Sequence, residues 1–294
     1  MYLSKGEKIF EAFNYIILTV FSLCFLLPFL FVVGTSFIGI EEWARRGAFI
    51  LIPERIDLGA YKMLLGRGSM MLNAYAVSIF RVSVGTMLNL AVTSTFAYAL
   101  ACRDLPGRTG FTVFVFITML FSGGLIPTFM LVDTLGLMNS LWVLIIPALM
   151  NPWWMLIMRN FFMAIPQEIE EAAIIDGATP PRILVSVILP ISLPSLATIG
   201  LFYAVWHWNE WFMAAIYLRE QVKYPIQLIL RAVLMMGTQS YRGEVMQMME
   251  ADVMPPAQTL KAATIIVSTV PILVVYPFLQ KHFVKGATLG SVKG

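Results

Sequence analysis

Long apolar runs separated by short polar segments dominate the pattern of this 294-residue chain. A helix needs about 20 apolar residues to cross a bilayer, and six runs reach that length. These runs cover residues 13–38, 72–102, 111–132, 140–161, 195–218 and 262–280. Prolines such as Pro28 and Pro147 fall inside them, and spans tolerate them because neighbouring helices satisfy the freed backbone groups. The pattern predicts an all-α membrane protein with six transmembrane helices.

Composition strengthens this prediction. The chain is 59% hydrophobic and 13% charged, with a mean hydropathy of +0.80, whereas soluble domains carry roughly 25% charged residues. The net charge of +3 gives no reason to expect a nucleic-acid partner. Cys24 and Cys102 lack the partners of a disulfide framework or a metal site, so both are expected to serve packing. Lys5 and Lys8 precede the first run as in a signal peptide, but that run is too long to be cleaved and is expected to be a retained span.

Residues 166–190 form a polar stretch between the fourth and fifth runs. Pro166 suits the first position of a helix, and Gly177 suits the left-handed position that ends one. Thr179 followed by Pro180 suits the start of a second helix. The stretch therefore predicts a helix, a glycine turn and another helix between two spans.

The first of these helices has two distinct faces at 100° per residue. One face carries Ile169, Ala172 and Ala173, and another carries Glu168, Glu171 and Ile175. Small alanines allow close approach, so this helix is predicted to dock against another protein. The alternative is an interfacial hairpin that only links two spans.

The spacing of Glu171-Ala172-Ala173, Gly177 and Leu189-Pro190 resembles the EAA loop of binding-protein-dependent ABC importer permeases. The family pattern is E-A-A-x3-G-x9-I-x-L-P, and Val187 stands here in place of the usual Ile. The resemblance implies the type I importer permease fold, in which this cytoplasmic loop is a coupling helix seated in a groove of an ATPase. The residues to which it assigns ATPase coupling are Glu170, Glu171, Ala172, Ala173, Asp176, Gly177, Arg182, Leu189 and Pro190.

Other segments resemble carbohydrate permeases of the same family, more narrowly the MalG-like subunits of the LplC/YtcP-type branch. They are residues 53–65, 73–107 and 276–294. The resemblance implies that the C-terminal tail reaches between two ATPases through Gly290, Ser291, Val292, Lys293 and Gly294. The alternative is a basic tail held near anionic membrane lipid.

The chain has no Walker A motif, G-x4-G-K-[ST], so it is not expected to bind or hydrolyse ATP itself. No catalytic residue, metal site or cofactor is expected in this chain. The resemblance implies a second, homologous permease subunit, two ABC ATPase subunits that use ATP and Mg²⁺, and an extracellular solute-binding protein.

Orientation does not follow from charge alone, because basic residues divide almost evenly between the two sides. Arg103 and Arg108 in one short loop favour cytoplasmic termini, and the EAA resemblance implies the same. The expected organisation in a bacterial plasma membrane is a cytoplasmic N-terminus (residues 1–12), a permease domain (13–281) and a cytoplasmic tail (282–294). The permease domain includes a long external loop, residues 219–261.

A polar and aromatic cluster lies in the fifth run. Ionisable groups at membrane depth usually face a cavity or a partner, and aromatic rings can stack on sugars. The candidates for a carbohydrate translocation path are Arg81, Trp206, His207, Trp208, Asn209 and Glu210. The alternatives are an aromatic belt at the membrane interface, a packing role for His207, and an ion pair between Arg81 and Glu210.

The sequence therefore predicts a permease subunit of an ATP-driven importer for carbohydrate, expected to be an oligosaccharide, that forms half of the pathway. The alternative is a stand-alone secondary transporter of small solutes, which usually needs ionisable groups near the midplane. Glu210 is the only acidic residue well inside a run, which argues against it. A membrane enzyme is disfavoured by the lack of H-E-x-x-H and G-x-S-x-G motifs.

Overall fold

A computed structural model describes residues 5–47, 50–66, 69–235 and 255–291, and the side chains of residues 6–275 within those ranges. This part of the chain is built from helices, turns and loops, and contains no strand. It divides into two compact units, which are residues 1–72 with 230–270 and residues 73–229 with 271–294. The all-helical prediction is confirmed for the described residues.

The first unit starts with helix α1, Lys5–Thr35, which runs without interruption through Pro28. α2 (Ile40–Arg46) and α3 (Gly59–Leu65) follow, and the N-terminal half of α15 belongs to the same unit. Thr259 of α15 donates a 3.0 Å hydrogen bond to the carbonyl of Ile38, which ties α15 to the segment that follows α1.

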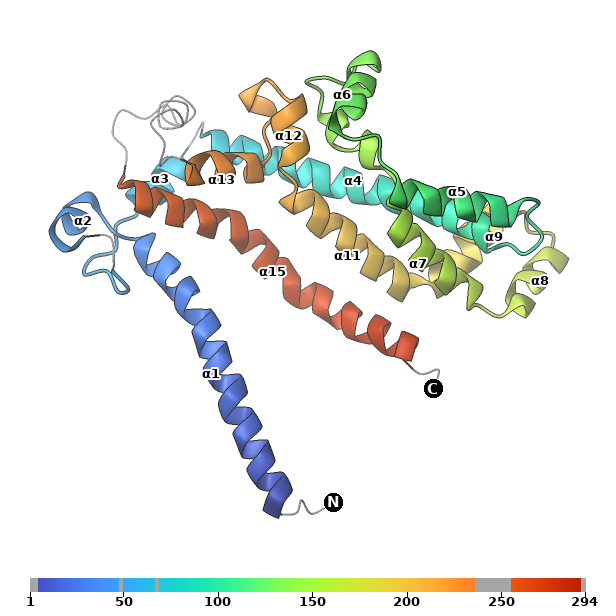
Figure 1. Cartoon of the computed structure of the whole chain (residues 1–294), viewed down its shortest axis with the longest axis horizontal. Helices are drawn as coiled ribbons and strands as arrows, with labels where there is room; N and C mark the ends of the chain where they lie inside the picture. The colour runs from blue at the N-terminus through green and yellow to red at the C-terminus, as the bar shows by residue number, and fades with distance from the viewer. Residues whose placement is uncertain (1–4, 48–49, 67–68, 236–254, 292–294) are drawn as a thin grey trace. The chain divides into compact units, whose positions relative to one another are not determined.

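The second unit contains the polar stretch 166–190 and the helices around it (Figure 1). Its longer helices are α4 (Met70–Ala101), α5 (Arg108–Leu120), α6 (Leu125–Thr134), α7 (Pro152–Met163), α8 (Gln167–Ile175) and α11 (Leu193–Asn209). Its shorter elements are η1 (Leu141–Leu144), η2 (Ile146–Ala148), α9 (Pro180–Ile183), η3 (Leu184–Ile188), α10 (Leu189–Ile191), α12 (Phe212–Tyr217) and η4 (Gln221–Lys223). α13 (Ile226–Leu234) and α15 (Ala257–Ser291) run from one unit into the other.

Three described helices are long and apolar enough to cross a membrane, at residues 6–35, 70–101 and 257–275. Three pairs of shorter helices qualify only if each bent pair forms one span. The pairs are residues 108–134 with a bend of 112°, 141–163 with a bend of 52°, and 180–209 with a bend of 88°. Counted this way, the described helices supply up to six spans, as predicted.

The predicted spans over 111–132, 140–161 and 195–218 each contain or adjoin a break. Gly124 before α6 has φ +85°, a conformation that favours glycine. Pro152 and Pro194 lie in the first turn of the helix after each of the other two breaks. Proline suits that position, because the first N–H groups of a helix have no intrahelical partner.

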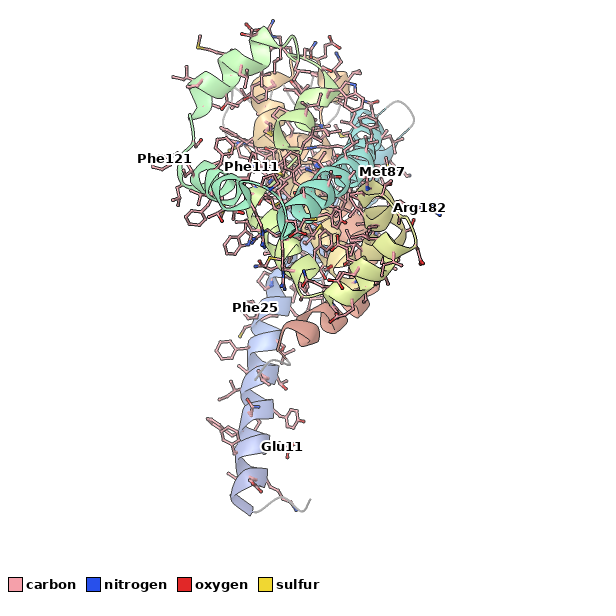
Figure 2. All side chains as sticks on the ribbon, turned by 90° about the vertical axis from the view of Figure 1, so that its right-hand side faces the viewer. Glu11, Phe25, Met87, Phe111, Phe121 and Arg182 are labelled. Carbon is pink, nitrogen blue, oxygen red and sulfur yellow. The ribbon has the colours of Figure 1, made fainter. Side chains whose placement is uncertain are left out.

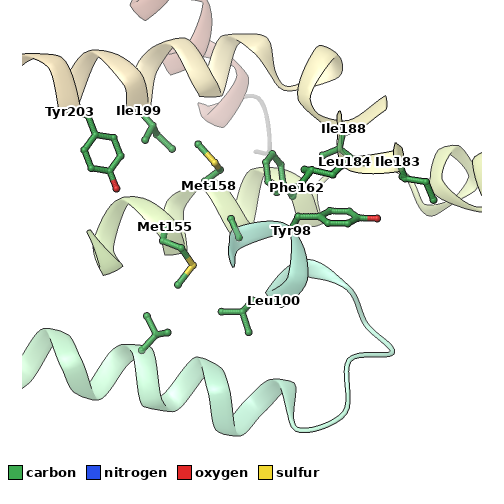
Figure 3. Packing of buried hydrophobic residues seen from close by; sticks show 12 residues of the cluster. Tyr98, Leu100, Met155, Met158, Phe162, Ile183, Leu184, Ile188, Ile199 and Tyr203 are labelled. Atoms are coloured by element: carbon green, nitrogen blue, oxygen red, sulfur yellow. The ribbon is translucent and has the colours of Figure 1, made fainter. Parts of the chain in front are cut away.

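The core of the second unit is a cluster of buried apolar side chains from α4, α5, α7, α9, η3 and α11. Figure 3 shows Tyr98 lying among Phe162, Ile183 and Leu184 at one end of this cluster. Tyr203 and Ile199 of α11 lie near Met155 and Met158 of α7. The core therefore joins α4 and α11 to the polar stretch that contains α8 and α9.

Many large apolar side chains point away from their helices rather than into a core. Phe25 of α1, Met87 of α4 and Phe111 of α5 are examples (Figure 2). Exposed apolar surface on this scale is unusual for a soluble monomer. It is typical of helices surrounded by lipid or by other membrane subunits.

Candidate functional site

The stretch 166–190 folds as a helix, a glycine turn and a second helix. α8 begins at Gln167, so Pro166 directly precedes the helix instead of occupying its first position. Gly177 follows the end of α8 with φ +78°, as predicted for a left-handed stop. Thr179 directly precedes α9, but its side chain makes no capping hydrogen bond, so only its predicted position is correct.

The two alanines of the EAA motif lie in different environments. Ala173 is half-buried and packs against the core, whereas Ala172 is exposed. Glu171 and Ile175 are also exposed, and 86% of Ile175 is accessible. The prediction that Ala172 and Ala173 share one face is therefore wrong, because a 100° step between neighbours places only Ala173 against the core.

The remaining residues predicted to couple to the ATPase lie before and after a π-helical turn, η3. Asp176 and Arg182 are exposed, Leu189 packs against the core, and Pro190 is exposed. The π-helical turn η3 directly precedes Leu189-Pro190. Pro190 has no N–H for the carbonyl four residues earlier, which disfavours an ordinary α turn there. Turns of this kind occur frequently at functional sites.

Glu170 of α8 contacts α4 through a hydrogen bond. The Tyr98 hydroxyl donates a 2.7 Å hydrogen bond to Glu170 Oε1. Both residues line a hollow of about 700 Å³, together with Cys102, Arg103 and Glu171. Cys102 lies just beyond the end of α4, and burial followed by the charge of Glu170 raises the pKa of its thiol.

Two arginines converge on the C-terminal end of α4. The Nε atoms of Arg108 and Arg159 each donate a 2.9 Å hydrogen bond to the carbonyl of Leu100. Carbonyls in the last turn of a helix lack intrahelical partners, and cations are favoured at that negative end of the helix dipole. The arrangement ties α5 and α7 to the end of α4 beside the hollow.

Arg81 and Glu210 form a buried ion pair, which was one of the alternatives left open by the sequence. Arg81 is 1% exposed, and its Nη2 lies 2.8 Å from Glu210 Oε2. Its Nη1 donates to the carbonyl of Glu210, and the backbone N–H of Met213 donates to Glu210 Oε1. The Arg81 guanidinium also lies 5.6 Å from the centre of the Trp206 ring. The pair therefore fixes the junction between α11 and α12.

The other residues of the aromatic cluster point in different directions. His207 is 1% exposed, and its Nε2 lies 2.7 Å from Asn89 Oδ1, which fits the predicted packing role. Trp208 lines an apolar hollow of about 460 Å³ together with Tyr75 of α4. Asn209 is exposed and donates to the carbonyl of Val205. Only Trp208 of these three combines an aromatic face with an open space.

A row of buried polar residues on α4 was not identified from the sequence. Asn89 donates a 2.6 Å hydrogen bond to the carbonyl of Ala148. Thr93 Oγ1 lies 2.7 Å from the Tyr203 hydroxyl, which also accepts from the backbone N–H of Asn151. The spacing of four between Arg81, Gly85, Asn89 and Thr93 places them on one helix face, and this was the available signal.

The predicted C-terminal site falls largely outside the described residues. The backbone of Gly290 and Ser291 continues helix α15, so the helix extends beyond the apolar run predicted to end at residue 280. Val292, Lys293 and Gly294 lie outside the part of the chain that the structure describes.

Comparison with known proteins identifies the family. The family described as "Binding-protein-dependent transport system inner membrane component" matches residues 98–288, which include α8, the glycine turn and the aromatic cluster. The chain belongs to this family. It is therefore a permease subunit of an ABC importer and a protein of the bacterial plasma membrane, and it has no catalytic role of its own.

Relatives match nearly the whole chain. The polygalacturonan/rhamnogalacturonan transport system permease protein YtcP of Bacillus subtilis is 43% identical over 288 residues, which cover 98% of this chain and 99% of YtcP. Protein LplC of Bacillus subtilis is 41% identical over 295 residues, covering 100% of this chain and 98% of LplC.

A solved structure shows the same fold. It is a chain of a bacterial ABC transporter involved in the import of the acidic polysaccharide alginate, with a TM-score of 0.85 and 31% identity. The match covers 96% of this chain and 99% of that chain. The predicted type I importer permease fold is confirmed, and the alternative of a stand-alone secondary transporter is not favoured.

Proposed function

We propose that this permease forms half of the translocation pathway of an importer for oligosaccharides that contain uronic acids. The substrates for which similar proteins are named support this class, because polygalacturonan, rhamnogalacturonan and alginate are uronate polysaccharides. The Trp208 ring, which lines the apolar hollow beside Tyr75, offers an aromatic surface on which a sugar ring can stack.

The stretch 166–190 couples this permease to an ATPase. The observation that carries this step is the outward face of α8, where Glu171, Ala172 and Ile175 are exposed while Ala173 packs on the core. A small residue between exposed charged and apolar ones allows another protein to approach the backbone closely. ATP binding and hydrolysis in partner subunits then bias the permease between conformations through this contact.

The remaining partners follow from the family. A second, homologous permease completes the pathway, two ATPase subunits bind ATP and Mg²⁺, and an extracellular protein delivers the solute. Both termini then lie in the cytoplasm, on the same side as α8. The tail Gly290–Gly294 is assigned a contact with the ATPases, and the loop 219–261 faces the binding protein.

Uptake of labelled oligogalacturonides by cells tests this proposal. Gly177→Pro is expected to abolish uptake, because proline cannot adopt the φ of +78° found at this position. Gly177→Asn is the matched control and should retain most uptake, because asparagine tolerates the left-handed conformation. Equal uptake by the wild type and the proline variant would contradict the coupling role. Uptake of a different sugar class by the wild type would contradict the substrate assignment alone.

A further inference from the structure

The attachment of α8 to the rest of the permease depends on few groups. Within the described residues, Glu170 is the one α8 side chain that hydrogen-bonds to another element. Ala173 adds an apolar contact with the core, and the flanking residues Ile165 and Ala178 pack against the same core. A single hydrogen bond to a charged group therefore provides the polar link between α8 and a long helix.

Tyr98 is well placed to make this link rigid. Its ring is 7% exposed and packs in the core with Phe162 and Leu184 (Figure 3). Its hydroxyl binds Glu170, and both residues line the hollow. A ring held by packing loses little further freedom on binding the carboxylate, and bonds to ionised acceptors are the stronger class.

The helix that carries Tyr98 continues to the buried ion pair. Arg81 and Tyr98 belong to the same unbroken helix, α4, roughly 26 Å apart at 1.5 Å per residue. Arg81 binds Glu210 at the end of α11. Asn89 and Thr93, which lie between Arg81 and Tyr98 on α4, both contact α11, and Asn89 also donates to the carbonyl of Ala148 before α7. α4 therefore joins α8 to both elements.

We infer that the Tyr98 hydroxyl is a positioning group that holds α8 against the end of α4, so that movement imposed on α8 is passed to α4. This inference rests on the proposed coupling role of the stretch 166–190. It divides the two adjacent glutamates by function: Glu171 faces the partner, and Glu170 holds the helix to its own chain.

The rate at which Cys102 is alkylated reports whether α8 remains packed against the end of α4. Cys102 lines the hollow beneath α8, and a Cys24→Ser background leaves it as the only thiol of the chain. In inverted membrane vesicles that contain the complete importer, Tyr98→Phe should accelerate labelling by N-ethylmaleimide about tenfold, the scale of one lost bond to a charged group. Uptake of oligogalacturonides should fall in the same variant.

Tyr98→Phe is the decisive variant because its electrostatic effect opposes the expected result. The Tyr98 hydroxyl lowers the pKa of the Cys102 thiol, so its removal alone would slow alkylation. Glu170→Ala removes a charge that raises this pKa and would speed alkylation without any movement of α8. Labelling is therefore not compared for Glu170→Ala, and only its uptake is measured. The double variant Tyr98→Phe/Glu170→Ala should lose no more uptake than the worse single variant.

Two matched controls separate positioning from general damage. Glu168→Ala removes an exposed carboxylate from the same helix, and Tyr217→Phe removes a hydroxyl from another buried tyrosine. Both should leave Cys102 labelling close to the wild type. Tyr217→Phe should leave uptake unchanged as well, whereas Glu168 shares the face of α8 that carries Glu171 and is read by labelling alone. An unchanged labelling rate in Tyr98→Phe would overturn the inference. If Gly177→Pro still abolished uptake in that case, the coupling role would stand without the Tyr98 link.

Discussion

At the scale of single residues, buried polar groups on α4 determine how its neighbours are held. Arg81 pairs with Glu210, and Asn89 joins His207 to the carbonyl of Ala148. Unpaired polar groups are costly in a span, because the bilayer offers no water to replace a lost partner. Substitutions at these positions should therefore act on stability before they act on transport.

The ion pair gives the first prediction. Glu210→Gln removes one charge and leaves Arg81 buried without compensation, so the free energy of unfolding should fall by about 3–5 kcal/mol. The double variant Arg81→Met/Glu210→Gln should recover most of this loss. Thermal unfolding of the detergent-solubilised protein measures both. Glu220→Gln, in the more accessible pair with Lys223, is the control and should change little. A double variant as unstable as the single one would contradict the account.

Gly85 gives the second prediction, because a Cβ at this position would collide with the ring of His207. Gly85→Ala should destabilise the protein by about 1–3 kcal/mol through overpacking. Gly110→Ala is the matched control, since its Cβ would meet nothing within 4 Å. That change should be neutral or stabilise helix α5 by up to about 1 kcal/mol. Equal melting temperatures for the two variants would show that α4 and α11 are less closely packed than described.

At the scale of elements, the sequence predicted where apolar helices occur but not how they break. The runs at 13–38 and 72–102 contain no strong interruption apart from Pro28, and both form continuous helices. The break before α7 involves a tertiary partner as well as a local proline. Pro152 leaves the carbonyl of Ala148 without an N–H donor, and Asn89, distant in sequence, supplies one. Periodicity along one segment carries no information about a donor on another.

The break before α7 gives the third prediction. Asn89→Ala should cost about 1–3 kcal/mol, because it leaves the Ala148 carbonyl without its donor. Pro152→Ala restores a backbone N–H that can reach this carbonyl in a continuous helix. The double variant should therefore be more stable than the sum of the single effects predicts, by about 0.5–3 kcal/mol. Strict additivity in thermal unfolding would show that Asn89 does not compensate for the proline.

The sequence predicted those features of the candidate site that depend on local backbone preferences, but not those that depend on tertiary contacts. The φ of Gly177 and the position of Thr179 follow from local preferences, and the sequence located both. The division between Ala172 and Ala173, and the contact between Tyr98 and Glu170, require the core to be known. The ion pair of Arg81 with Glu210 could be named as an alternative, but nothing in the sequence brought the two residues together.

At the scale of the whole molecule, the described residues expose large apolar surfaces and the polar stretch 166–190. A complete importer would cover these with lipid, a second permease and an ATPase. Purification of the tagged chain from its own membranes in mild detergent, followed by mass spectrometry, tests the central claim most directly. Ala172→Trp should block close approach to α8 without disturbing the core, because Ala172 is exposed.

The account predicts that an ABC ATPase and a second permease of the same family co-purify with the wild-type chain in comparable amounts. Ala172→Trp should retain the second permease and lose most of the ATPase. A wild-type chain that purifies alone, or an Ala172→Trp variant that retains the ATPase in full, would contradict the claim that the stretch 166–190 couples this permease to ATP hydrolysis.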